Sequence, residues 1–240
     1  MTAWPSGYGL KDFDEIDSTN EEARRLAASG HRAPVWISAA RQTAGRGRRG
    51  RVWESPTGNL AATLLLFPEK PAAECAQLSF VTAIAAADAI AGLAPFATVK
   101  VKWPNDVLVD GSKLAGILLE SQGEWLAVGV GINLAHFPTD TLFPATSIAA
   151  LGAPVPLRQD ALIQLAGHFA KWYDVWRAEG FAPIRDAWLA RAGGLGQRIK
   201  ARLSHEETAG VFEGIDETGA LILREDGKGT RAISAGEVFF

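Results

Sequence analysis

Five arginines fall within the eleven residues from Arg41 to Arg51, in a chain of 240 residues with a formal net charge of −3. Cations this close together repel one another, and a bound anion would relieve this repulsion. Guanidinium groups bind phosphates and carboxylates through paired hydrogen bonds, and glycines leave the segment mobile. Residues 45–51, which read GRGRRGR, therefore predict a loop that closes over a phosphorylated or adenylated ligand. A solvated basic turn is the alternative.

The same segment matches the GxGxxG spacing of dinucleotide-binding loops. In those loops the last glycine opens a helix, and backbone N–H groups hold the pyrophosphate. Residues 52–58, VWESPTG, do not form such a helix, and a row of guanidinium groups does not suit a loop that works through its backbone. The pattern therefore disfavours dinucleotide binding. Trp53 follows directly after the cationic loop.

A second polar group surrounds an interruption in an apolar stretch. Asn105 and Asp106 follow Pro104, which cannot donate to a central ladder, so a bulge or an edge position is predicted there. Asp110-Gly111 predicts a tight turn, and Lys113 begins the returning strand. Because strands joined by a tight turn are neighbours, Lys113 is predicted to face the same site as Asn105. An exposed hairpin lysine is the alternative for Lys113 alone.

Three glycines, Gly116, Gly129 and Gly131, lie in the two strands predicted after this turn. Glycine weakens strands, and residues two apart share one face of a sheet. A face without side chains lets a flat ligand lie against the backbone, and Asn133 continues it. A β-bulge or a close strand crossing is the alternative.

Ser18 with Glu21 three residues later is a capping box and predicts a helix over residues 19–29. The free N–H groups at such a helix start also suit a polar ring or an anion. The remaining apolar patterns predict strands and helices that must position these groups. The predicted strands are 34–40, 60–67, an interrupted 99–109, 114–120 and 125–134, and the predicted helices are 73–91, 157–179 and 181–192. Beyond the glycine linker 192–196, three or four short strands predict a small β-barrel.

Composition narrows the classes of protein. With 48% hydrophobic and 21% charged residues the chain is globular, and the net charge disfavours a dedicated nucleic-acid binder. One cysteine, Cys75, makes no internal disulfide, and four widely separated histidines show no metal-ligand spacing. The apolar stretch 78–93 is too short and interrupted to span a bilayer, and no secretory signal is seen, so the cytoplasm is the expected compartment.

Taken together, five strings resemble the biotin protein ligase family: DSTN at 17–20, Gln42 with GRGRRGRVW at 45–53, KWPND at 102–106, KLAGI at 113–117 and GVGINL at 129–134. The resemblance covers the whole chain. It implies an α+β catalytic domain over residues 1–192, with a mixed, largely antiparallel sheet packed with helices as in class II aminoacyl-tRNA synthetases. It also implies a small SH3-like β-barrel over residues 193–240. Because the first motif begins at residue 17, the ligase-only class without an N-terminal DNA-binding domain is expected.

The resemblance implies two half-reactions. Biotin and ATP, whose phosphates carry Mg²⁺, form biotinyl-5′-AMP and pyrophosphate, and a lysine of a biotin carboxyl carrier protein then attacks the adenylate. It implies catalytic roles for Lys113, Arg48 and Asp106, and no resident metal site. The implied biotin-binding residues are Ser18, Thr19, Asn20, Gln42, Gly45, Arg46, Gly47, Arg48, Lys113, Gly116, Gly129 and Gly131. The implied ATP-binding residues are Arg48, Arg51, Trp53, Asn105, Lys113 and Asn133.

Two alternatives remain at this point. A lipoate ligase or octanoyltransferase shares the fold, although the arginine loop and the KWPND and KLAGI strings favour biotin. A nucleic-acid-binding protein using the arginine segment on phosphates is disfavoured by the net charge and by the lack of aromatic residues interleaved in the loop. No nucleic-acid or membrane partner is expected, and a homodimer paired through the strands near 125–134 is a possibility.

Overall fold

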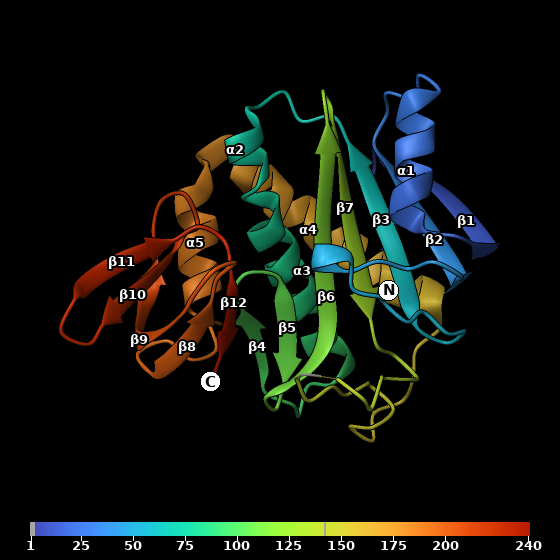
Figure 1. Ribbon diagram of the computed structural model, residues 1–240. Helices are drawn as coiled ribbons and strands as arrows, with labels where there is room; N and C mark the ends of the chain where they lie inside the picture. The colour runs from blue at the N-terminus through green and yellow to red at the C-terminus, as the bar shows by residue number, and fades with distance from the viewer. Residues whose placement is uncertain (1–2, 142) are drawn as a thin grey trace.

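The computed structural model describes residues 3–141 and 143–240 and consists of two sheets flanked by helices (Figure 1). The larger sheet has seven strands in the order β1-β2-β3-β7-β6-β5-β4. β1 and β2 are parallel, and all other neighbours are antiparallel. The predicted mixed, largely antiparallel sheet is therefore confirmed. Its strands are β1 (Gly9–Ile16), β2 (Val35–Gln42), β3 (Leu60–Leu66), β4 (Val99–Lys102), β5 (Asp106–Val109), β6 (Ser112–Gln122) and β7 (Trp125–Ile132).

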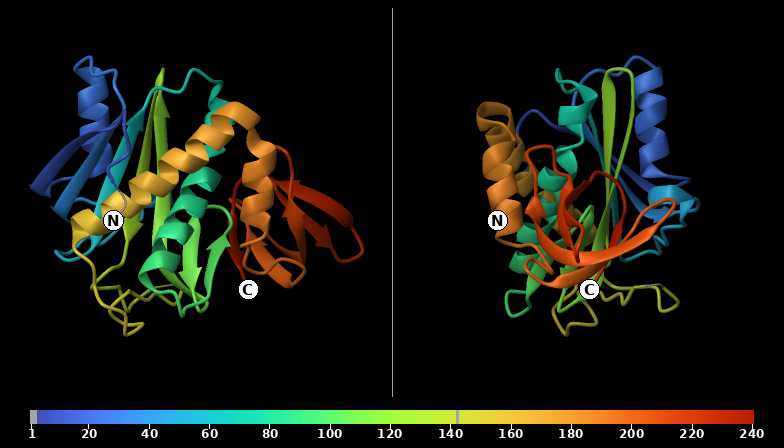
Figure 2. Two further views of the ribbon diagram at one scale, coloured as in Figure 1. Left: turned by 180° about the vertical axis from the view of Figure 1, so that it is seen from behind. Right: turned by 60° about the vertical axis from the view of Figure 1, so that its left-hand side comes forward.

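Helices cover both faces of this sheet, as the two views of Figure 2 show. α1 (Thr19–Ala28) packs on β3 and β7 from one side, while α3 (Leu78–Leu93) and α4 (Arg158–Glu179) lie against each other on the opposite side. The short α2 (Ala72–Cys75) precedes α3, and α5 (Phe181–Leu189) follows α4. Two apolar clusters form, one on each face, because central strands such as β3 bury side chains on both sides.

The helical stretch Ala72–Leu93 is long and apolar enough, by length and composition, to cross a membrane, but 61% of its most apolar window is buried inside the protein. Eleven residues of α3 are buried, on every side of the helix. A helix that is apolar all round suits the centre of a fold between a sheet and further helices. The predicted buried helix is confirmed, although it divides into α2 and α3.

Local sequence explains the start of α1 and the turn before Lys113. The Ser18 hydroxyl accepts a hydrogen bond from the Glu21 N–H at 3.4 Å, so the predicted N-cap is confirmed. Asp110 and Gly111 have φ values of 48° and 82°, the left-handed pair that a two-residue hairpin turn requires. Lys113 consequently starts β6 directly beside β5.

Several predicted elements differ from the observed ones. Residues 99–109 form two antiparallel strands, β4 and β5, joined at Trp103-Pro104-Asn105, instead of one strand with a bulge. β1 was not predicted, because its apolar residues, Leu10, Phe13 and Ile16, are three positions apart and do not show the alternation of a half-buried strand. β7 lies between β3 and β6 and is hydrogen-bonded to both, so it has no free edge through which a second subunit could pair.

The second sheet is antiparallel and has five strands, in the order β11-β10-β9-β8-β12, instead of three or four. They are β8 (Arg198–Arg202), β9 (Glu207–Ile215), β10 (Leu221–Glu225), β11 (Gly229–Ile233) and β12 (Glu237–Phe239). The two sheets touch near the β4–β5 turn, where the Trp103 indole N–H donates to the Gly219 carbonyl at 3.0 Å. This contact brings β12 beside the polar groups that follow Pro104.

Candidate active site

A cavity of about 390 Å³ lies where the arginine loop, the glycine-bearing strands, the β4–β5 turn and β12 meet. Sixteen of the seventeen residues implied by the family resemblance line it: Ser18, Thr19, Asn20, Gln42, Arg46, Gly47, Arg48, Arg51, Trp53, Asn105, Asp106, Lys113, Gly116, Gly129, Gly131 and Asn133. Gly45 lies behind the lining, where an added Cβ would stand 2.4 Å from the Trp53 carbonyl oxygen. The topology therefore gathers motifs from distant parts of the sequence into one site.

The glycine face of β6 and β7 is bare because neighbouring side chains need the room. A Cβ on Gly131 would lie 2.3 Å from the Trp53 ring, and a Cβ on Gly129 would lie 2.3 Å from the side-chain oxygen Oδ1 of Asn20. The register is continuous, with Gly116 opposite Gly131, so the bulge alternative does not hold at these positions. The glycines admit an indole and an amide against the sheet.

A buried polar network surrounds the start of α1. The Gln42 Oε1 accepts from the Thr19 N–H at 2.8 Å and lies 3.0 Å from the Thr19 hydroxyl. The Thr63 hydroxyl lies 2.6 Å from Asn20 Oδ1, and Asn20 Nδ2 donates to Glu120 at 2.7 Å. The Gln42 amide is held by Thr19 and Ser55, and the Asn20 amide by Thr63 of β3 and Glu120 of β6. The donors and acceptors at this end of the cavity are therefore fixed in place.

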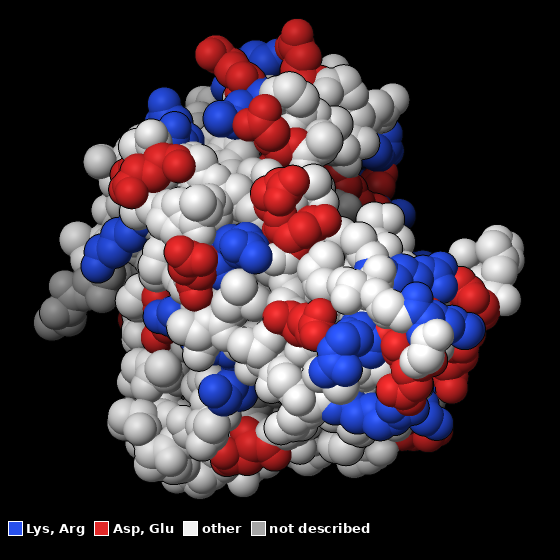
Figure 3. Space-filling view, turned by 90° about the vertical axis from the view of Figure 1, so that its left-hand side faces the viewer, with Lys and Arg blue, Asp and Glu red and all other residues white. Residues whose placement is uncertain are grey.

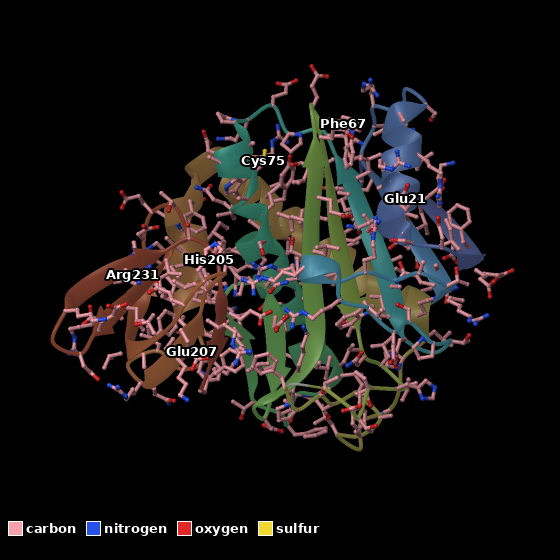
Figure 4. The ribbon with its side chains drawn as sticks, viewed as in Figure 1. Glu21, Phe67, Cys75, His205, Glu207 and Arg231 are labelled. Atoms are coloured by element: carbon pink, nitrogen blue, oxygen red, sulfur yellow. The ribbon has the colours of Figure 1, made fainter. Side chains whose placement is uncertain are left out.

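Three of the five cations in the lining have carboxylate partners. Lys113 Nζ lies 2.6 Å from Asp106 Oδ1. Arg46 pairs with Glu21 at 3.2 Å and lies 3.7 Å from Glu120, and Arg51 pairs with Glu237 of β12. Figure 4 labels Glu21, which projects from the first turn of α1. Incoming ligand anions can therefore replace these carboxylates by exchange of ion-pair partners.

The two other cations face neutral groups. Arg48 donates to Asn105 Oδ1 at 3.3 Å and to the Gly236 carbonyl at 3.5 Å. Burial, with a smaller contribution from Arg49, lowers the pKa of Arg48. Lys102 is 5% exposed and forms no ion pair with any described residue. Burial lowers the pKa of Lys102 from 10.5 to about 8.

Sequence reasoning missed four lining or supporting residues: Lys102, Glu120, Phe143 and Glu237. Lys102 alternates with the buried Val101 in β4, but alternation alone does not distinguish a site lysine from an exposed one. Glu237 and Phe143 reach the cavity only because β12 and the loop after β7 fold over it. No local pattern identifies them. Among residues 3–141 and 143–240, no group of three or more His, Cys, Asp or Glu side chains could hold a metal ion.

Comparisons with known proteins agree with this arrangement. Residues 13–135 match the Biotin/lipoate A/B protein ligase family, and residues 194–240 match the Biotin protein ligase C terminal domain. The chain belongs to this ligase family. The first match contains the arginine loop, the KWPND and KLAGI strings and the glycine strands, and the second contains all five strands of the smaller sheet.

Individual members of the ligase family are similar over nearly the whole chain. It is 49% identical to a biotin–[acetyl-CoA-carboxylase] ligase of Paracoccus denitrificans, over 93% of this chain and 97% of that protein. It is 34% identical to the bifunctional ligase/repressor BirA of Bacillus subtilis, over 97% of this chain and 74% of that protein. The structure of an Aquifex aeolicus biotin protein ligase in complex with biotin and ATP has a TM-score of 0.85, at 27% identity over 96% of this chain and 97% of that one.

Proposed function

We propose that this protein is a biotin–[biotin carboxyl carrier protein] ligase, which activates biotin with ATP and transfers it to a carrier lysine. The observation that carries the proposal is one cavity in which cations, a polar network and a glycine face meet, in a chain 49% identical to a biotin–[acetyl-CoA-carboxylase] ligase. That likeness favours biotin over lipoate or octanoate.

The first half-reaction joins two anions, the biotin carboxylate and the α-phosphate of ATP. Their repulsion must be neutralised, and cations fixed before the reaction do this most effectively. We assign Lys113 to bridge the carboxylate and the α-phosphate, because it lines the cavity and an incoming anion can replace Asp106, with which it pairs at 2.6 Å. ATP brings Mg²⁺ on its phosphates.

The polar network at the start of α1 suits the ureido ring of biotin, which has two N–H donors and one carbonyl acceptor. We assign Ser18, Thr19, Asn20 and Gln42 to this ring. The glycine face of β6 and β7 supports the site indirectly, because it makes room for the Trp53 indole and the Asn20 amide that line the cavity. Arg46, Arg48 and Gly47 belong to the loop that closes over the adenylate, with Gly45 behind it. Arg51, Trp53, Asn105 and Asn133 are assigned to the nucleotide.

In the second half-reaction a carrier lysine must lose a proton and attack the acyl carbon of the mixed anhydride, whose bond to the phosphate oxygen breaks as AMP leaves. We assign Asp106 to meet this amine, because its carboxylate is released when Lys113 turns to the adenylate.

Basic and acidic side chains are intermingled over the face made by the smaller sheet (Figure 3), with pairs such as Arg231 with Glu206 and Arg224 with Glu213. This pattern gives no continuous basic surface there for nucleic acid.

The proposal also includes a division into domains and a cellular compartment. We divide the chain into a catalytic domain, residues 1–192, and a C-terminal domain, residues 193–240, because the glycine linker separates two sheets. We place the reaction in the cytoplasm, which supplies ATP and keeps the free, buried thiol of Cys75 reduced.

The test is incubation with biotin and ATP, followed by mass spectrometry for biotinyl-5′-AMP. The Lys113→Ala variant is expected to lose about 10²–10³-fold in the rate of adenylate formation, because it loses a charge that stabilises the transition state. Lys100→Ala, an exposed lysine of β4 outside the cavity, is the matched control. Pyrophosphate release at the wild-type rate by Lys113→Ala contradicts the assignment, and lipoyl-AMP formed in preference to biotinyl-AMP contradicts the choice of substrate.

A further inference from the structure

Lys102 is a buried cation that none of the roles above uses. Its side chain is 5% exposed and lines the cavity, yet no acidic side chain among the described residues pairs with it. Burying a charge without a counter-ion is costly. A sequence that retains such a group in a binding cavity leaves it ready for an anion that arrives from outside.

The surroundings of Lys102 indicate which anion. Asp106, Lys113 and Arg51 are the charged groups close enough to act on it. The carboxylates there are already engaged, Asp106 with Lys113 and Glu237 with Arg51. In the ligand-free site Lys102 therefore has no carboxylate of its own among the described residues. A polyphosphate chain, with several negative charges in a row, supplies what this end of the cavity lacks.

Aromatic rings hold the Lys102 ammonium in place. Its Nζ lies 3.3 Å from the centre of the Phe143 ring, and 5.9 and 5.8 Å from those of Phe239 and Phe240. Phe143 stacks on Phe239 of β12 with ring centres 4.7 Å apart. Such a cation–π contact offsets part of the burial cost, and the rings exclude water, so a bound phosphate interacts with the ammonium more strongly than it would in water.

We propose that Lys102 is a catalytic residue of the adenylation step, which contacts the β- and γ-phosphates of ATP and stabilises the departing pyrophosphate. The inference rests on the proposed function and deepens it. A biotin carboxylate oxygen forms a bond to the α-phosphorus, while the bond from that phosphorus to the oxygen bridging to the β-phosphate breaks. Pyrophosphate leaves with the electron pair. Because negative charge grows on the β-phosphate side during this step, a fixed ammonium there stabilises the transition state more than the ground state.

The test compares Lys102→Met with the wild type and with Lys100→Met, which removes an exposed lysine two residues earlier in β4. Methionine keeps the length of the side chain and removes its charge. We expect Lys102→Met to lose about 10²–10³-fold in pyrophosphate release from biotin and ATP, and to be inhibited at least ten-fold less by inorganic pyrophosphate. The affinity for biotin, and transfer of biotin from supplied biotinyl-5′-AMP to a carrier, should stay within two-fold of wild type. Lys102→Arg, which keeps the charge, should recover part of the rate.

Two results with Lys102→Met overturn the inference and leave the proposed function standing. Pyrophosphate release by Lys102→Met within three-fold of wild type means that the ammonium does not serve the leaving group. An equal loss in transfer from supplied adenylate means that Lys102 only supports the shape of the site. A wild-type protein that forms no biotinyl-5′-AMP overturns the proposed function and this inference with it, whereas an active Lys102→Met protein overturns the inference alone.

Discussion

Replacing Lys102 with methionine should make the ligand-free protein more stable while it impairs adenylation. The pKa of Lys102 falls from 10.5 to about 8 through burial. At 1.36 kcal/mol per pKa unit, keeping this side chain charged in the folded state costs about 3 kcal/mol at pH 7. Loss of the contact with Phe143 offsets about 1 kcal/mol, so the net gain for Lys102→Met is about 2 kcal/mol. For a chain of this size, that is a rise of about 4–8 °C in Tm.

The gain should depend on pH in one direction. Because the folded-state pKa lies below the unfolded value, the cost of the charge is fully present below pH 8 and disappears as pH rises from 8 to 10.5. The linkage relation gives a cost of about 3 kcal/mol at pH 7 and about 1 kcal/mol at pH 10. The wild type should therefore approach the stability of Lys102→Met in alkaline buffer.

Urea unfolding followed by tryptophan fluorescence, at pH 7 and pH 10, measures this difference, provided the m-values of the two proteins agree. Lys100→Met, at an exposed position, should be within about 0.5 kcal/mol of wild type at both pH values. The reasoning is refuted if Lys102→Met is less stable than wild type at pH 7, or if its advantage is the same at pH 10. Either result would show that the ammonium is compensated in the empty site.

Three further variants test the loop, the glycine face and an ion pair. Gly131→Ala places a methyl 2.3 Å from the Trp53 ring and should destabilise by about 1–3 kcal/mol with a changed fluorescence spectrum; an unchanged spectrum contradicts the close packing. Arg48→Gly, in the middle of the loop, should release biotinyl-5′-AMP faster and label bystander lysines; equal dissociation rates for variant and wild type would falsify closure over the adenylate. The hydrogen bonds from Arg25 lower the pKa of Asp17 to about 2, so its stabilisation is present above pH 4 and lost as pH falls towards 2. Both groups are more than one-third exposed, so Asp17→Asn should cost only about 0.5 kcal/mol at pH 7, and a cost that persists at pH 2 contradicts the ion pair as its source.

The cap and the turn were predicted residue by residue because their causes are local. The cap at Ser18 and the turn at Asp110-Gly111 depend on residues within three positions of each other, so their sequence suffices. The strand that ends in Lys102 was harder, because Pro104 is equally compatible with a bulge and with a turn between two strands. Only the pairing of β4 with β5 decides for the turn. β1 was not predicted, because an edge strand needs few apolar residues and those of β1 do not alternate with polar ones.

The sequence by itself determined the chemistry of this site: the arginine loop, the lysine that a tight turn places near Asn105, and the glycines in two neighbouring strands. These features depend on residue type and on spacings of a few residues, so they can be read from the sequence. Tertiary structure alone decided which groups complete the cavity. Glu237 and Phe239 lie on a strand of the second sheet, and they reach Arg51 and Lys102 because the two sheets meet there, where Trp103 donates to the Gly219 carbonyl. Burial of Lys102 is likewise a property of packing, since a lysine acquires a lowered pKa only when surrounding elements remove it from water.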